Sequence, residues 1–258
     1  MALIELDLNK SIEQNASDYY DKAKKLKKKQ EGAKEALAES YGKLEKLEKE
    51  QLKEERKQEK KIEIKKEWYE KFRWFFSSEG FLVIGGRDAT SNEIVVKKHT
   101  DKGDIVFHTD MVGSPFFVIK SDNKEITEQT IKEVADATVT FSRAWKLGMQ
   151  TSSVFYCKPD QLTKEALPGE YVPRGGFVTK GKLNYVENKI NCAIGNYNGK
   201  AMAGPISAVK KNCENYFEIK PGRDKASVVA KKINKKLELE VDDIVRILPT
   251  GGYELKKP

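Results

Sequence analysis

The sequence has few cysteines and no long apolar run. Its three cysteines, Cys157, Cys192 and Cys213, are odd in number and widely spaced, which excludes a disulfide framework and a C-x-x-C zinc knuckle. No apolar stretch reaches the ~18 residues that a membrane span needs. The first residues, MALIELDLNK, place no basic region before an apolar core, which argues against a signal peptide. We therefore expect a cytoplasmic protein with no membrane partner.

Acidic residues are outnumbered by basic ones. The 258 residues include 48 lysines and arginines against 40 aspartates and glutamates, for a formal net charge of +8. Such a surface favours polyanions, nucleic acid first and acidic membranes second. The plainer interpretation, a solvated lysine-rich helix, stays open.

The first quarter of the chain has a heptad pattern. Small and apolar residues step alternately by four and three, which is typical of a coiled-coil helix, and they form what we call the seam: Ile12, Ala16, Tyr19, Ala23, Leu26, Ala33, Leu37, Leu44 and Leu47, with Gln30 and Ser40 in register. Ser11 is the expected N-cap. The seam turns polar from Glu54 and aromatic again at Trp68, Phe72 and Phe75. The pattern therefore predicts one helix over about 12–77, whose last turns enter the globular core.

A coiled-coil helix needs a partner, and the chain offers no free second helix of that kind. The partner is therefore either a second copy or a missing N-terminal part of the same protein. The opening run LIELDL is expected to be the end of a strand, so we expect the chain to be a fragment of a longer protein.

The rest of the chain predicts an α+β fold, a mixed sheet with flanking helices. Alternating or apolar runs predict strands at 81–86, 104–110, 115–120 and 152–157, followed by short strands after Gly169 and by YFEIKPG closing on a turn. Helices are expected over 90–96, with Thr90 and Glu93 as a capping box, and over 127–147, 225–237 and 242–248. The expected domains are a coiled-coil arm (1–66), a globular domain (67–190) and a C-terminal α/β extension packed on it (191–258).

The stretch GGFVTKGKLN nearly matches a phosphate-binding loop. From Gly176 it follows G-x-x-x-x-G-K, but Leu183 replaces the Ser or Thr that would hold magnesium. No buried strand precedes it and no helix follows, so nucleotide hydrolysis is disfavoured. A hairpin that presents Lys180 and Lys182 on one face, near Arg174, fits better. That face could bind a nucleic-acid backbone or could simply be solvated.

Both histidines lie in KKHTDKGDIVFHTD. His99, His108 and Asp110 could ligate a metal and activate water, although their spacing matches no established metal motif. Two other interpretations stay open. The imidazole could donate a hydrogen bond to RNA, or it could simply form hydrogen bonds within the protein. We expect no metal and no cofactor.

Arg87 and Asp88 follow a predicted strand at a glycine turn, where side chains are displayed on a rigid edge. Arg87 could contact phosphate or a base edge, or it could pair with Asp88 and pin the loop. Of the three tryptophans, which could stack on bases, Trp74 is expected in the core.

These stretches together resemble the opening of the NFACT-R domain of the NFACT family (NEMF-type, fibronectin-binding-protein-A-like). EWYEKFRWFFSSEGFLVIGGRDATSNE supplies the residues of the W-x-E-K-F, W-F, Ser-pair, G-R-D and N-E pattern, and GDIVFHTD, SRAW and GEYVPRGGFVTKGKLN continue it. HTDMVGSP resembles the archaeal form. The resemblance spans about 3–184.

Members of this family work in ribosome-associated quality control, so the resemblance implies a non-catalytic RNA-binding module. Its implied partners are the large ribosomal subunit rRNA and tRNA on stalled nascent-chain complexes, and its implied role is support of mRNA-independent C-terminal tailing. The family motif carries over Arg87, Asp88, Asn92, His108, Lys180, Gly181, Lys182 and Asn184. With the neighbouring basic residues, the expected nucleic-acid-binding set is Arg87, Asp88, Asn92, Lys97, Lys98, His108, Arg174, Lys180, Lys182 and Asn184. The alternatives are a metal-dependent nuclease or hydrolase using His99, His108 and Asp110, and a coiled-coil assembly protein.

Overall fold

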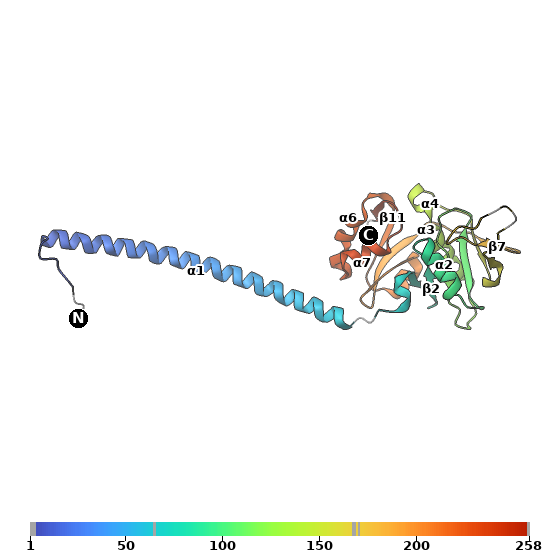
Figure 1. Ribbon diagram of the computed structural model, residues 1–258, viewed down its shortest axis with the longest axis horizontal. Helices are drawn as coiled ribbons and strands as arrows, with labels where there is room; N and C mark the ends of the chain where they lie inside the picture. The colour runs from blue at the N-terminus through green and yellow to red at the C-terminus, as the bar shows by residue number, and fades with distance from the viewer. Residues whose placement is uncertain (1–3, 64–65, 167–168, 170, 257–258) are drawn as a thin grey trace. The chain divides into compact units, whose positions relative to one another are not determined.

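The computed structural model describes residues 4–63, 66–166, 169 and 171–256, which divide into two units, residues 1–65 and 66–258 (Figure 1). The first unit is a long helix and the second is a mixed α+β domain. The predicted α+β class with a preceding long helix is confirmed. No helix in the described residues is long and apolar enough to cross a membrane.

Helix α1 (Ile12–Glu63) carries the predicted seam. The larger seam residues, among them Leu26 and Leu37, are exposed at 65% and 60%. Exposed leucines at heptad spacing fit a coiled coil that has no partner within this unit.

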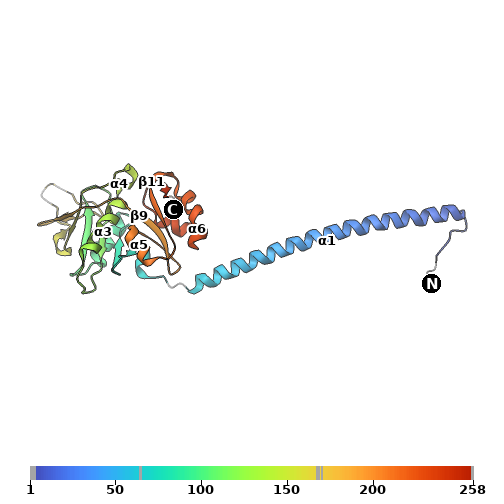
Figure 2. The ribbon, with the colours of Figure 1, turned by 180° about the vertical axis from the view of Figure 1, so that it is seen from behind.

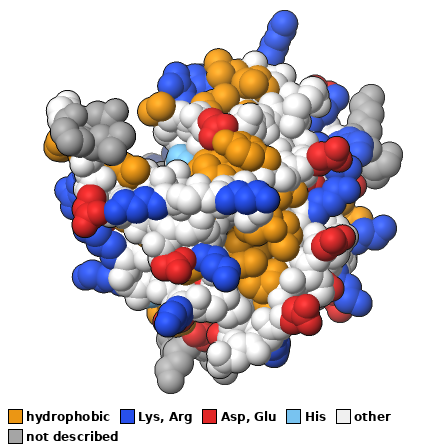
Figure 3. Space-filling model, turned by 90° about the vertical axis from the view of Figure 1, so that its right-hand side faces the viewer, with side chains coloured by type: hydrophobic (Ala, Val, Ile, Leu, Met, Phe, Trp, Pro, Cys, Tyr) orange, Lys and Arg blue, Asp and Glu red, His pale blue; other side chains and the backbone are white. Residues whose placement is uncertain are grey.

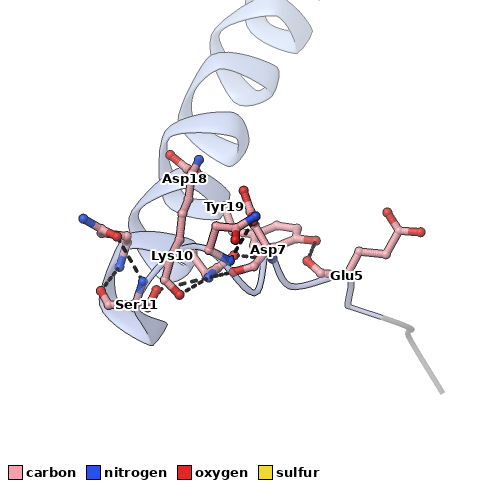
Figure 4. Close-up of polar contacts among 9 residues, drawn as sticks. Glu5, Asp7, Lys10, Ser11, Asp18 and Tyr19 are labelled. Carbon is pink, nitrogen blue, oxygen red and sulfur yellow. Dashed lines mark hydrogen bonds and ion pairs between the residues drawn. The ribbon is translucent and has the colours of Figure 1, made fainter.

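The start of α1 is locked by a reciprocal cap (Figure 4). The backbone N–H of Gln14 donates to Ser11 Oγ at 3.2 Å, and that of Ser11 donates to Gln14 Oε1 at 3.0 Å. The buried Asn15 side chain also donates to the Asp7 carbonyl and accepts from the Asp7 N–H. Residues 4–7 thus fold back beside the first turn as irregular chain, and the predicted strand end at LIELDL is wrong.

The predicted helix to about residue 77 is also wrong. α1 ends at Glu63, and a short 3₁₀ turn, η1 (Trp68–Lys71), is followed by strand β1 (Arg73–Phe76). β1 forms an antiparallel hairpin with β2 (Leu82–Gly85), in which Trp74 faces Ile84. Aromatic residues suit a pleated, half-buried surface, and pairing with β2 gives this short run its hydrogen bonds. Trp74 is buried in the core, as predicted.

β1 and β2 begin a six-stranded antiparallel sheet of order β1-β2-β4-β3-β5-β8. The remaining members are β3 (Ile105–Thr109), β4 (Phe117–Ile119), β5 (Val154–Cys157) and the edge strand β8 (Asn184–Val186). Strands predicted at 81–86, 104–110, 115–120 and 152–157 are therefore present. A separate two-stranded sheet joins β6 (Leu162–Thr163), which follows the turn η2 (Pro159–Gln161), to β7 (Val178–Thr179).

Helix α2 (Ala89–Lys98) is capped differently from the prediction. Asp88, not Thr90, is the N-cap, and its carboxylate accepts the Ser91 N–H at 2.8 Å. Glu93 is thereby free to bind elsewhere.

The predicted helix over 127–147 is divided into α3 (Glu128–Thr140), capped by Thr127, and α4 (Arg143–Leu147). Ser142 ends the first segment by capping the second, since its hydroxyl accepts the Ala144 N–H at 3.1 Å.

A four-stranded antiparallel sheet of order β10-β9-β11-β12 follows. Its strands are β9 (Cys192–Tyr197), β10 (Lys200–Gly204), β11 (Tyr216–Asp224) and β12 (Tyr253–Leu255), with helices α5 (Ile206–Asn212), α6 (Ala226–Leu237) and α7 (Val241–Ile247). β11 continues through the expected turn at YFEIKPG, with a register shift between Pro221 and Asp224. α6, α7 and β11 lie at one end of the unit and β7 at the other (Figures 1 and 2).

The two larger sheets share one core. β10 packs against β1, where Gly204 leaves room for the Phe75 ring, because a Cβ at Gly204 would lie 2.9 Å from that ring. Asn212 also donates to the carbonyls of Phe76 and Ser77. The C-terminal residues are therefore built into the same hydrophobic core as β1.

Candidate nucleic-acid interface

A cavity of about 420 Å³ lies where the start of α2 meets residues 112–116 and 173–177. Five of the ten predicted site residues line it: Arg87, Asp88, Asn92, His108 and Arg174. Arg73, Phe141, Phe177 and Thr250 also line it, and the lining holds three arginines and one carboxylate. We call this cavity the arginine pocket.

Arg87 is anchored to backbone rather than to Asp88. Its Nη2 donates to the Phe72 carbonyl at 2.8 Å and to the Glu70 carbonyl at 3.3 Å. Its Nε is buried and has no hydrogen-bond partner among the described residues. Burial, together with the positive charge of Arg246, lowers the pKa of Arg87 to about 10, so the guanidinium still carries its charge at neutral pH.

Arg73 lies close to Arg87 and also lacks a carboxylate partner in the described part of the chain. It donates to the Leu248 carbonyl at 3.3 Å, and its guanidinium lies 4.6 Å from the centre of the Phe141 ring. Burial and then repulsion by Arg87 lower the pKa of Arg73 to about 10. Two arginines held near each other without an intervening carboxylate make this side of the pocket strongly positive in charge.

Asn92 positions the pocket wall. Its Oδ1 accepts the Phe116 N–H at 3.1 Å, and its Nδ2 donates to the Ser114 carbonyl at 3.3 Å. Asn92 is buried, and Gly86 allows this approach, since a Cβ there would lie 1.9 Å from Asn92 Oδ1. Asn92 therefore connects α2 to the 114–116 segment, and both polar ends of its side chain are already occupied.

His108 is held by similar contacts. Its Nε2 lies 3.2 Å from the Ser114 carbonyl oxygen and, because a carbonyl can only accept, this bond requires the tautomer with the proton on Nε2. The imidazole stacks on Phe116, with ring centres 4.0 Å apart. Burial lowers the pKa of His108, so the ring is neutral at pH 7 and donates one hydrogen bond to the wall.

The predicted metal alternative does not form a centre here. His99 stacks on Trp68 with ring centres 4.7 Å apart, whereas His108 stacks on Phe116. Asp110 is exposed and accepts from Tyr185 at 3.4 Å. Across the ranges that the structure describes, no group of three or more His, Cys, Asp or Glu is placed to hold a metal ion.

The opposite wall comes from the residues before β7. Arg174 is exposed and makes no hydrogen bond within the described residues. The pKa of Asp88 is lowered mainly by the hydrogen bond from the Ser91 backbone and also by the positive charge of Arg174. Gly175 has φ +77° and approaches Ala89 so closely that a Cβ would lie 2.4 Å from the Ala89 carbonyl oxygen. The Gly175 N–H also donates to Glu93 Oε2 at 3.1 Å. These contacts fix the distance between this segment and the start of α2.

Glu93 is the hub of that connection. Besides Gly175, it pairs with Lys97 at 2.7 Å and with Lys164 at 3.3 Å. These partners lower its pKa to about 2, with the hydrogen bond from Lys97 as the largest cause.

The other five predicted residues lie outside the arginine pocket. Lys97 and Lys98 are exposed in the last turn of α2. Lys180 pairs with Glu165 at 2.6 Å, Lys182 is exposed, and Asn184 begins edge strand β8. The predicted hairpin is wrong, because β7 pairs with β6 and β8 pairs with β5. Lys180 and Lys182 flank Gly181 in the connection between two different sheets, so they do not share a strand face.

The structure also shows what the near-match to a phosphate-binding loop forms. Gly175 and Gly176 belong to a turn, β7 follows them, and no helix begins at Lys182. The expectation that this segment lacks the strand-loop-helix form of a P-loop is confirmed.

Comparison with known proteins decides the family of this domain. Residues 71–181 match the family model described as NFACT protein RNA binding domain. The chain carries the RNA-binding domain of the NFACT family. The resemblance found in the sequence is confirmed, and the matched NFACT-R region contains the whole lining of the arginine pocket except Thr250.

Curated relatives agree with that assignment. The Archaeal Rqc2 homolog aRqcH of Methanocaldococcus jannaschii is 43% identical over 77% of this chain and 31% of its own length. The Ribosome quality control complex subunit NEMF of Homo sapiens is 37% identical over 67% of this chain and 16% of its own length. The Drosophila melanogaster NEMF homolog is 34% identical over 72% of this chain and 19% of its own length. This chain thus spans less than a third of each of these three relatives.

Arg73, Phe177 and Thr250 line the pocket but are not among the predicted site residues. The heptad pattern places Arg73 near the end of a predicted helix, although a single arginine inside the aromatic run KFRWFF is a signal of a functional side chain. Phe177 lies within the loop motif GGFVTKGKLN, which points to its glycines and lysines. Thr250 approaches from the C-terminal end of the chain, and no local pattern marks it.

Proposed function

We propose that this chain is the RNA-binding module of a ribosome-associated quality control factor that acts in the cytoplasm. In this proposal it binds large-subunit rRNA and tRNA on stalled nascent-chain complexes and supports mRNA-independent C-terminal tailing. The ribosome forms the peptide bond, so the module supplies recognition and no catalytic residue. The names of the relatives, which refer to Rqc2 and to the ribosome quality control complex, support this role.

One observation carries the proposal: the match to an RNA-binding domain coincides with the arginine pocket. Guanidinium groups bind phosphate with fixed geometry. Figure 3 looks onto the end of the unit that carries β7, where hydrophobic side chains lie among lysines and arginines. Such a mixture of basic and apolar surface suits RNA, whose phosphates and unstacked bases need both.

The test is a salt titration of the 258-residue protein with tRNA and with a large-subunit rRNA fragment. We expect tight binding whose logarithm falls linearly with the logarithm of salt concentration, with a slope of about −0.7 to −0.9 for each phosphate contact. Polyglutamate of matched length is the control. Equal affinity for polyglutamate and RNA would contradict the proposal, because net charge alone would then explain binding.

An assembly role has support of its own from the exposed seam of α1. We propose that the seam pairs with a second copy of this chain or with another segment of a longer protein that contains it. Sedimentation at several concentrations tests the second copy: a dimer with no affinity for RNA would favour assembly as the main function.

A further inference from the structure

The arginine pocket is lined by more positively charged than negatively charged side chains. It contains the guanidinium groups of Arg73, Arg87 and Arg174 against the single carboxylate of Asp88. Asp88 already accepts from Ser91 as the cap of α2. Within the described residues, Arg73 has one hydrogen bond and Arg174 has none. An anion with several oxygen acceptors would complete this set of donors.

The pocket also offers an aromatic surface next to those donors. Phe116 and Phe141 are buried, and their rings pack on His108 and against Arg73. Phe177 is partly exposed, with its ring centre 5.3 Å from that of Phe116. Lys164 Nζ lies 4.5 Å from the centre of the Phe177 ring, so a ligand would stack on the ring face turned away from Lys164.

The size of the pocket limits the ligand. Its volume of about 420 Å³ lies within the ~300–1,000 Å³ typical of small-ligand sites. A duplex keeps its bases stacked inside and offers no ring face, whereas an unpaired nucleotide offers a ring face and a phosphate together.

We propose that the arginine pocket holds one unpaired nucleotide of single-stranded RNA, with its phosphate beside Arg73 and Arg174 and its base against Phe177. This inference rests on the proposed RNA-binding function and deepens it. The mutual repulsion of Arg73 and Arg87 supports it, because a phosphate beside Arg73 offsets the excess positive charge there.

The experiment measures the anisotropy of a fluorescent single-stranded RNA bound to the 258-residue protein, with AMP, UMP and inorganic phosphate as competitors. Arg174→Ala is the first variant. Its side chain is exposed and forms no hydrogen bond within the described residues, so the substitution should leave the fold intact. Arg223→Ala is its matched control, since Arg223 is also exposed and lies outside the pocket lining. Phe177→Leu keeps the apolar bulk and removes the aromatic face.

We expect Arg174→Ala and Phe177→Leu each to weaken binding of the single strand about tenfold, in line with the loss of one phosphate contact or one stacked base. Arg223→Ala should leave it nearly unchanged. Both nucleotides should compete with the RNA, inorganic phosphate should compete far less, and the oligonucleotide should bind more tightly than either mononucleotide.

Three results would overturn the inference: unchanged affinity in both pocket variants, competition by phosphate as strong as by AMP, or tighter binding of free AMP than of RNA. In each case intact RNA binding by the unsubstituted protein would leave the proposed function standing. Absence of any RNA binding would remove both.

Discussion

Lys120 pairs with two carboxylates that differ sharply in burial. Replacing each one separately tests whether burial determines how much such a pair contributes to the stability of the fold. Its Nζ binds Asp101 at 2.5 Å and also binds Asp104. The Asp104 side chain is 1% exposed, the Lys120 side chain 10%, and the Asp101 side chain 84%. Asp104 further accepts the backbone N–H groups of Ser121 and Asp101. The perturbation is Asp104→Asn compared with Asp101→Asn.

The two variants should differ because of burial. An asparagine at 104 has one oxygen where the aspartate has two, so its NH₂ group must face one of the three donors. Removing one partner of a buried ion pair costs about 3–5 kcal/mol, because the remaining charge stays buried. Losing the exposed Asp101 carboxylate should cost about 1 kcal/mol or less. For a domain of this size, the larger loss corresponds to a melting temperature lower by roughly 6–20 °C.

Urea unfolding followed by tryptophan fluorescence, together with thermal unfolding, measures both variants. The small effect of Asp101→Asn should shrink further at 1 M salt, since exposed pairs are screened, whereas the loss in Asp104→Asn should persist. Similar losses of stability in the two variants would refute the reasoning that burial decides the strength of these pairs.

Three further predictions concern the pocket wall and the arm. Asn92→Ala leaves the buried Phe116 N–H without its acceptor, so urea unfolding should show a loss of about 1–3 kcal/mol. Glu93 has a pKa of about 2 in the fold against an ordinary value of 4.5, so its stabilisation is present above pH 4.5 and is lost as pH falls towards 2. The stability difference between the protein and Glu93→Gln, measured by urea unfolding at several pH values, should therefore shrink across that interval. Replacing Leu26 and Leu37 by Asp should barely change the unfolding midpoint, because both are exposed, but should abolish any self-association seen by sedimentation.

Exposed positions supply the controls for these variants. Thr90→Ala, on the same helix as Asn92, should be close to neutral, and so should Glu214→Gln, because both residues are exposed. An Asn92→Ala variant no less stable than Thr90→Ala would remove Asn92 from its positioning role. A stability difference for Glu93→Gln that is constant from pH 7 to pH 2 would contradict the lowered pKa of Glu93. Self-association that survives both Asp substitutions would show that the seam is not the contact surface between copies.

Local patterns were enough to predict many of the elements. The heptad spacing and Ser11 predicted the long helix and its start, and the helix predicted from Thr127 begins there, with Thr127 as the N-cap of α3. Alternation predicted a strand over 104–110, and β3 lies within one residue of each end of that range. These features depend on neighbours a few positions apart, where side-chain spacing and capping hydrogen bonds act directly. The same patterns failed at 73–76, where four residues are too few to separate a strand from the end of a helix.

The arginine pocket shows most clearly what the sequence determines and what only the tertiary structure determines. The sequence by itself identified Arg87, Asp88, Asn92 and His108 as candidate site residues through the resemblance to the NFACT-R pattern, and Arg174 as a basic residue near the GGFVTKGKLN motif. It could not show that these residues lie together. Nor could it show that Asn92 and His108 form hydrogen bonds to the 114–116 segment, while Arg174 forms no hydrogen bond within the described residues. That outcome depends on contacts between segments more than 80 residues apart, such as the bond from Gly175 to Glu93. Only the folded chain brings such groups together, because long-range pairing follows from packing of the whole core and leaves no periodic mark in the sequence.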